Sequence, residues 1–314
     1  MRIFRHEADR LPIALITLLF CCDVVIWALV DSPMVLAGWI VVTLTARGGV
    51  CAFNHHHQHL SVFRGQTLNR LLELMYGLQT GITSKGWVLH HSLGHHLNYL
   101  DQSKDESRWR RENGSRMREL EYAFSVAVTA YPRMWQVARR RQAQGRVFIA
   151  MAVLTLAIVG TLFVLRPVPT LIVFILPMML MLLHTSWHTY SHHAGKKTTS
   201  HFVASNNVLH RGYNLLTGNL GYHTAHHYKP GLHWSQLPAL HDKIAHKIPA
   251  DCYLSPSIPW HIRQRVVGPP PGMPFAPGTS IAEDCESAVN RAVQSRNVVG
   301  GTPKPVHVLP NRRA

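Results

Sequence analysis

Histidine is the residue type with the clearest chemical pattern in this chain. Fifteen of the 23 histidines fall in four short stretches: 55–59, 90–96, 184–193 and 223–227. Within these stretches they recur at intervals of three and four, which place side chains on one face of a helix. Imidazole is the commonest side-chain ligand of iron, copper, zinc and nickel. The pattern therefore predicts a large metal site.

The ligand types narrow the choice of metal. A structural zinc site needs four ligands and usually recruits thiolates. The five cysteines are scattered, with no C-x-x-C pair, and form no such framework. About nine or ten histidines are enough for two ions with four or five ligands each. Neutral nitrogen ligands without obvious carboxylates fit iron, copper or zinc.

Four apolar stretches indicate how these histidines are positioned. They cover about 11–30, 34–53, 147–165 and 168–187. A hydrocarbon core of roughly 30 Å requires about 20 helical residues. We therefore expect an all-α integral membrane protein with four transmembrane helices in two hairpins.

Basic residues predict the orientation of these helices. The two turns within the hairpins, 31–33 and 166–167, hold one of the 32 Lys and Arg residues. Because Lys and Arg favour the cytoplasmic side, both termini and the central loop are expected there, in the cytoplasmic membrane. The net charge of +16 then fits contact with anionic membrane lipids. No nucleic-acid-binding motif accompanies it, so no nucleic acid partner is expected.

The histidines fall at one end of the predicted helices. If the second helix starts at Met34, His55 lies about 31 Å along its axis, and His59 lies one turn further on. At the end of the fourth helix, His188 and His192 continue a stripe that begins at His184. The other clusters lie in segments expected to form a cytoplasmic helical cap that holds a di-metal histidine site: His91, His95, His96, His223, His226 and His227. An i, i+4, i+8 stripe of Asn206, His210 and Asn214 lies between the last two clusters.

These boxes resemble those of the integral-membrane fatty acid desaturases of the non-haem di-iron, histidine-box superfamily. First-box character lies in His55 to His59. The second box has the form H-x-x-x-H-H from His91, and the third has the form H-x-x-H-H from His223. The resemblance covers roughly Leu11 to His246 and is specific for the superfamily, not for the substrate.

The resemblance implies an O2-dependent desaturase that introduces a double bond into a fatty acyl chain. It implies two Fe ions, O2 as co-substrate, and electrons from a separate donor, ferredoxin-like or similar. The acyl group would arrive as an acyl-lipid, acyl-CoA or acyl-carrier-protein substrate. Related hydroxylases, acetylenases and carotenoid ketolases share the scaffold and stay alternatives. A metal transporter fits less well, because its ligands should lie near the bilayer midplane.

The resemblance also implies the ligands. The family adds histidine from the region after the fourth helix, for which His188 and His192 are favoured and His210 is next. Box one lacks the acidic residue that many relatives have after the first histidine, so His56 or His57 competes for a role. The expected ligands are His55, His59, His91, His95, His96, His188, His192, His210, His223, His226 and His227.

The remaining segments divide the chain into a membrane domain, 1–261, and a Pro/Gly-rich tail, 262–314, that is expected to be disordered. The apolar stretch 68–82 is short for a span and is expected to be re-entrant or interfacial. The basic segment 108–146 predicts an interfacial helix or, alternatively, a docking face for an acidic electron carrier. Asp23 within the first span is either a functional acid or a polar group at a helix end.

Overall fold

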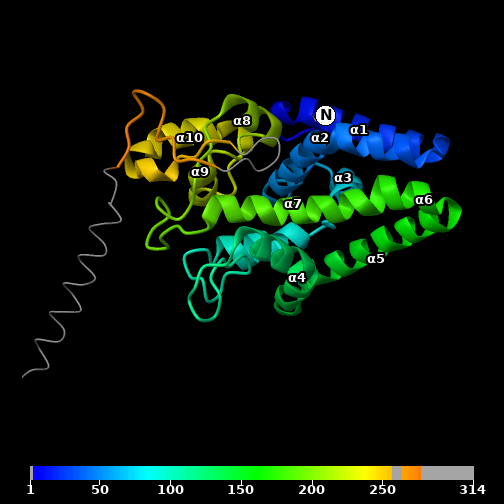
Figure 1. The fold of residues 1–314 in the computed structure, drawn as a ribbon, viewed down its shortest axis with the longest axis horizontal. Helices are drawn as coiled ribbons and strands as arrows, with labels where there is room; N and C mark the ends of the chain where they lie inside the picture. Colours follow the sequence, from blue (N-terminus) through cyan, green and yellow to red (C-terminus); the bar gives the residue numbers. More distant parts are fainter. Residues whose placement is uncertain (1–2, 257–263, 277–314) are drawn as a thin grey trace, which may run out of the picture. The chain divides into compact units, whose positions relative to one another are not determined.

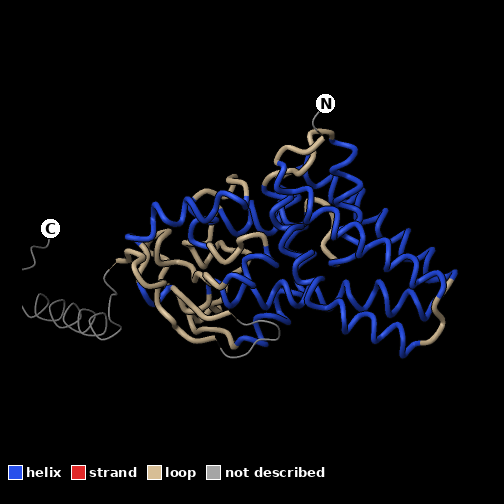
Figure 2. The backbone as a smooth tube through the Cα atoms, turned by 90° about the horizontal axis from the view of Figure 1, so that it is seen from above, coloured by secondary structure: helices blue, strands red, loops and turns tan. Residues whose placement is uncertain are grey.

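The computed structural model describes residues 3–256 and 264–276, and these residues form helices and loops with no β-strand (Figure 2). The result confirms the all-α fold. The helices are α1 (Arg10–Leu29), α2 (Pro33–His59), α3 (Gln66–Thr80), α4 (Glu119–Arg140), α5 (Gln142–Leu165), α6 (Pro167–Thr170), α7 (Leu176–His193), α8 (Arg211–Thr217), α9 (His223–Tyr228) and α10 (Leu237–Ile244). Two π-helical segments, η2 (Val88–His96) and η3 (Leu171–Ile175), complete the parts that matter for the site.

Among the described residues, four helical stretches are long and apolar enough to cross a membrane, as predicted: Glu7–Leu29, Pro33–His59, Gln142–Leu165 and Pro167–His193. The second and fourth continue six residues beyond their predicted ends, through the histidine clusters. These added turns carry His59 and His192, which the sequence placed in stripes at the ends of the two helices. Figure 1 shows α1 beside α2, and α5 beside α6, from where α5 and α7 diverge. The two-hairpin topology across a membrane stays a prediction.

The short apolar stretch forms α3, which packs against α2 and α7. Its end is fixed by Gly81, whose φ of +69° is left-handed and whose Cβ, if present, would lie 2.5 Å from the carbonyl oxygen of Met178. Only glycine tolerates both conditions. The turn directs the chain into η2, which carries the second histidine box.

Asp23 has a partner inside the helical bundle. Arg47 of α2 donates to both oxygens of the Asp23 carboxylate, at 2.5 and 3.1 Å, and both side chains are 1% exposed. Trp39 donates to the same carboxylate at 2.8 Å, while Arg47 Nε donates to Thr43 Oγ1 at 3.1 Å. The pair neutralises the only two formal charges that the sequence places in the first two apolar stretches, and it joins α1 to α2.

Part of the predicted tail returns to the helical body. Val267 N donates to Tyr253 O, and Ala276 N donates to Ile248 O, both at 3.0 Å. Met273 packs against the cluster that includes Leu237. The rest of the predicted tail, 262–263 and 277–314, lies outside the described residues.

Candidate metal centre

The π-helix η2 determines which histidines of the second box lie next to each other. Its i→i+5 hydrogen bonding differs from that of an α-helix, in which residues four apart share a face. Here the residues five apart meet, because the Nε2 atoms of His91 and His96 lie 2.9 Å apart. His95 points to a different group of histidines. Gly94 allows the following loop to approach, since a Cβ there would lie 2.5 Å from Glu106 Cγ.

A first cluster consists of five histidines whose ring nitrogens all lie within 4.8 Å of one another: His55, His59, His91, His96 and His226. They come from α2, η2 and α9. The Nε2 atoms of His55 and His59 are 3.0 Å apart, as are those of His96 and His226. Two nitrogens bound about 2.1 Å from one cation at a right angle are about 3.0 Å apart. The spacing therefore suits a shared ion.

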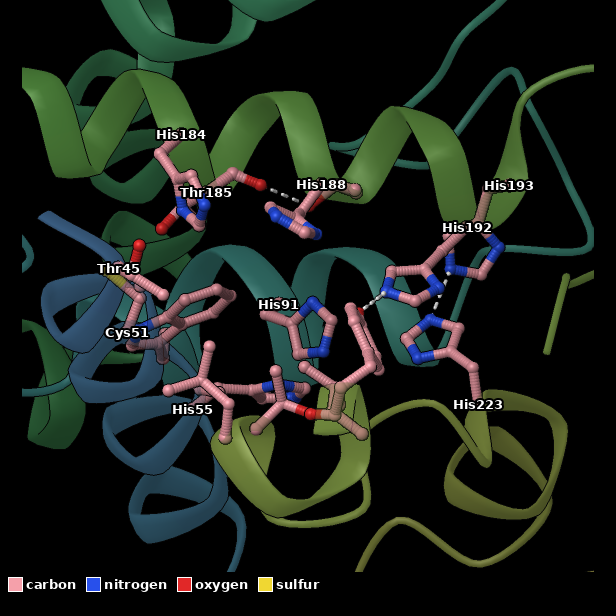
Figure 3. A pocket seen from close by; sticks show the side chains of 18 of the residues that line it. Thr45, Cys51, His55, His91, His184, Thr185, His188, His192, His193 and His223 are labelled. Atoms are coloured by element: carbon pink, nitrogen blue, oxygen red, sulfur yellow. Dashed lines mark hydrogen bonds between the residues drawn. The ribbon is translucent and has the colours of Figure 1, made fainter. Parts of the chain in front are cut away.

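A second cluster contains His95, His193 and His227, again with ring nitrogens within 4.8 Å of one another. His223 adjoins it, because its Nε2 lies 3.0 Å from that of His193 (Figure 3). The Nε2 of His223 also lies 3.2 Å from that of His227. The two clusters are in contact: the rings of His96 and His227 stack with centroids 4.1 Å apart. The arrangement offers two neighbouring positions for cations.

The hydrogen bonds of the second cluster define its tautomers. His95 Nδ1 lies 2.8 Å from the carboxylate of Asp105, and His193 Nδ1 lies 3.0 Å from the carbonyl oxygen of Ala204. Both partners are acceptors, so each Nδ1 carries a proton, and the neutral tautomer of each ring presents a lone pair at Nε2. These two Nε2 atoms are 3.2 Å apart. Opposed lone pairs repel unless a cation lies between them, so the residues fit a bound metal.

Burial keeps the other histidines available as ligands. Burial first, and then neighbouring imidazoles, hold the pKa of five cluster histidines well below the usual value: His91, His96, His223, His226 and His227. An imidazole with a lowered pKa is neutral at pH 7. A metal therefore binds there without displacing protons.

Besides His223, which adjoins the second cluster, three expected ligands lie outside both clusters. The ring of His192 stacks on that of His223 with centroids 3.9 Å apart, and its Nε2 lies 3.2 Å from the hydroxyl of Tyr213. His210 caps α8 by accepting a hydrogen bond from the backbone of Tyr213. His188 lines a cavity instead. The two competitors in box one also face elsewhere: His56 Nε2 lies 3.1 Å from the carbonyl oxygen of Thr217, and His57 faces Glu73.

Sequence reasoning did not single out His193. It selected the i, i+4 stripe of His188 and His192, although His193 is the residue of α7 in the second cluster. One signal was available. Adjacent histidines occur in all three boxes, at His55 to His57, His95 to His96 and His226 to His227, and the pair that ends α7 repeats this pattern.

A cavity connects the two clusters with the space between α2 and α7 (Figure 3). His55 and His91 of the first cluster and His193 of the second line it, together with His223. Thr45 lines it as well, ten residues before His55, or about 15 Å along the axis of α2. The cavity thus has the metal positions at one end and extends from them along two candidate membrane spans.

Fold and site together define a class: a helical membrane protein with a candidate metal centre built from histidines of two long helices and the segments that cover them. A family model described as fatty acid desaturase matches residues 32–259, which contain all the clustered histidines. The chain belongs to the fatty acid desaturase family, as the boxes indicated. The family makes the protein an oxidoreductase of lipid metabolism with an acyl-lipid substrate. No curated protein matches the chain.

Proposed function

We propose that the protein is an O2-dependent fatty acyl desaturase with a di-iron centre that receives electrons from a separate donor. The first iron would be held by His55, His59, His91, His96 and His226, and the second by His95, His193, His223 and His227. Five nitrogen ligands exceed the four of zinc, and imidazole suits iron. The family match is consistent with iron.

The observation that carries the proposal is that both clusters line one cavity between α2 and α7. Aliphatic side chains such as Leu44, Leu216 and Leu220 give this cavity a surface that an acyl chain can cover. An acyl chain in it would lie along the helices, with one segment beside His55, His91 and His193. The cavity therefore excludes water from the reacting methylenes and orients them toward the metal positions.

When bound, the irons and O2 would supply the oxidant that removes hydrogen from an unactivated methylene. The reaction balances as R-CH2-CH2-R′ + O2 + 2 e− + 2 H+ → R-CH=CH-R′ + 2 H2O. The clustered imidazoles would hold the metals through ring nitrogens. Asp105 and the carbonyl of Ala204 keep the protons of His95 and His193 on Nδ1, away from the centre.

A hydroxylase is the second candidate, because polar side chains also line the cavity. His184, Thr185 and His188 border it on the α7 side. Such groups can form hydrogen bonds with an oxygenated product. The two reactions differ in the fate of the second hydrogen, so their products identify them directly.

We also propose that the protein lies in the cytoplasmic membrane with its termini and histidine clusters on the cytoplasmic side. Support comes from the turns 31–33 and 166–167, which hold one of the 32 basic residues. A soluble, ferredoxin-like donor would then reach the centre from the cytoplasm.

The test is expression in a bacterial host, followed by gas chromatography and mass spectrometry of total fatty acids. We expect a new alkene that disappears in His95→Ala and persists in His246→Ala, because His246 is exposed and outside both clusters. An oxygenated product would assign the hydroxylase instead. Exchangeable zinc with metal flux, and no lipid product, would favour a transporter and contradict the proposal.

A further inference from the structure

A basic cleft lies beside α4 and the loop after η2. Its lining contains five cations and one acid: Lys104, Arg108, Arg133, Arg140, Arg141 and Glu106. None of its lining residues lines the cavity between α2 and α7. The cleft is therefore a separate feature that binding of an acyl chain does not use, and its charge suits an anionic partner.

The faces of α4 indicate on which side the cleft opens. Four large apolar side chains are exposed along one stripe of this helix: Leu120, Phe124, Val128 and Trp135. Six α4 residues line the cleft: Thr129, Pro132, Arg133, Gln136, Val137 and Arg140. At about 100° per residue, the centres of these two groups lie roughly 150° apart around the helix axis. An apolar stripe of this kind lies on the acyl boundary of a bilayer. The cleft then opens toward water, which favours a soluble partner over a lipid headgroup.

The cleft is directly connected to the second cluster. Gly94 and Glu106 line it, and each is adjacent in sequence to a residue of the metal centre: Gly94 to His95, and Glu106 to Asp105. The Asp105 carboxylate accepts the 2.8 Å hydrogen bond from His95. Glu106 N donates to Gly94 O at 3.3 Å, and Arg133 donates to Glu106 O. A partner in the cleft is thus one residue and one hydrogen bond away from a metal ligand.

We propose that this cleft is the docking site for the acidic face of a soluble one-electron carrier protein, and that Asp105 and His95 link it to the metal pair. The inference rests on the proposed function. Each docking oxidises one carrier by one electron and reduces the metal pair by one electron. Two dockings supply the two electrons that the desaturation consumes with one O2 and two protons. An acyl carrier protein is also acidic, but it would need to dock where its chain enters the cavity.

The test compares two neighbouring charge reversals, Arg140→Glu and Arg139→Glu, in the full-length, iron-loaded protein. Both arginines are exposed on α4, but only Arg140 lines the cleft. Reduction of the iron by a reduced, acidic [2Fe-2S] ferredoxin is followed by stopped-flow absorbance. The measurements are made at about 0.01 M salt, where charges act over about 30 Å, and at about 1 M, where they are screened within about 3 Å.

We expect Arg140→Glu to slow reduction about 10-fold at low salt and the difference to disappear at high salt. Arg139→Glu should change the rate less than about 2-fold. Iron content, and reduction by dithionite, should be the same in both variants and in the wild type. Equal slowing in both variants, or no slowing in Arg140→Glu, would overturn the proposal.

Two further outcomes separate this inference from the proposed function. If Arg140→Glu raises the KM for acyl-carrier-protein substrate while ferredoxin still reduces the iron at the wild-type rate, the cleft docks the acyl carrier and the inference is wrong. If the dithionite-reduced wild type converts no acyl substrate with O2, the proposed desaturation fails, whatever the ferredoxin rates show.

Discussion

Replacement of Asp105 tests whether the second cluster is a metal site held in one tautomer. The buried carboxylate accepts hydrogen bonds from His95 Nδ1 at 2.8 Å and from the backbone of Ser107 at 2.7 Å. Hydrogen bonds to charged groups contribute about 1.5–3 kcal/mol. At about 1.4 kcal/mol per tenfold, loss of the bond to His95 in Asp105→Ala should weaken iron binding about 10- to 100-fold. Asp105→Asn keeps an acceptor oxygen without the charge, so its loss should be about 10-fold or less.

The assay is iron per chain after equilibration with graded concentrations of a chelator. Asp105→Ala should release its iron at a lower chelator concentration than Asp105→Asn, and both should do so before the wild type. Asp101→Ala is the matched control, because Asp101 is a partly exposed acid of the same loop whose partners are Ser103 and Lys104. Wild-type iron retention in Asp105→Ala, or equal loss in Asp101→Ala, would refute the assignment of His95 as a ligand held by this bond.

Three other predictions concern the bundle, its buried acids and the cavity. Asp23→Leu should destabilise the protein by about 3–5 kcal/mol, since it leaves Arg47 buried without its partner. Thermal unfolding should show that adding Arg47→Leu recovers most of this stability. A double variant as unstable as Asp23→Leu would contradict the pairing. Burial opposes ionisation of Glu73, but neighbouring His57, Ser84 and Arg70 outweigh it and lower its pKa to about 2, with Lys85 Nζ 3.9 Å away. A lowered carboxyl pKa stabilises the fold above the ordinary value near 4.5 and loses this effect as the pH falls toward 2; Glu73→Gln should therefore unfold at a lower temperature at pH 7, with a gap to the wild type that narrows below pH 4.5. Thr45→Phe should shift products toward shorter acyl chains in mass spectrometry, because Thr45 lines the cavity far from His55; an unchanged chain-length profile would place the acyl chain elsewhere.

Regular α-helical spacing predicted correctly which histidines lie together where the backbone is α-helical. His55 and His59 are four residues apart in α2, and they meet in the first cluster as the spacing indicated. The same rule puts His91 beside His95, and their ring centroids are 5.1 Å apart, but in the π-helix η2 the Nε2 of His91 lies 2.9 Å from that of His96, five residues on. Periodicity in the sequence does not reveal a π-helix. The π-helix is less stable than an α-helix by itself, and packing in the folded protein stabilises it.

Helical spacing favoured His188 and His192 of α7, whose role as ligands stays a prediction, while the structure places His193 in the second cluster. Consecutive residues of an α-helix point about 100° apart. The π-helical segment η3 precedes α7 and changes the rotational phase of every residue after it. Counting from the start of the fourth span therefore locates the histidines along the axis but not around it. The pairing of Asp23 with Arg47 similarly depends on how α1 and α2 are rotated against each other.

The division of short segments between the two clusters has a consequence for how the protein acquires metal. η2 contributes His91 and His96 to one cluster and His95 to the other, and α9 contributes His226 to one and His227, with the adjoining His223, to the other. A cation bound in either cluster orders both segments, so the second cation binds ligands whose conformational entropy is already lost. Loading should therefore be cooperative. When iron is scarce, the population would divide into empty and fully loaded molecules, and total activity would follow the number of complete centres.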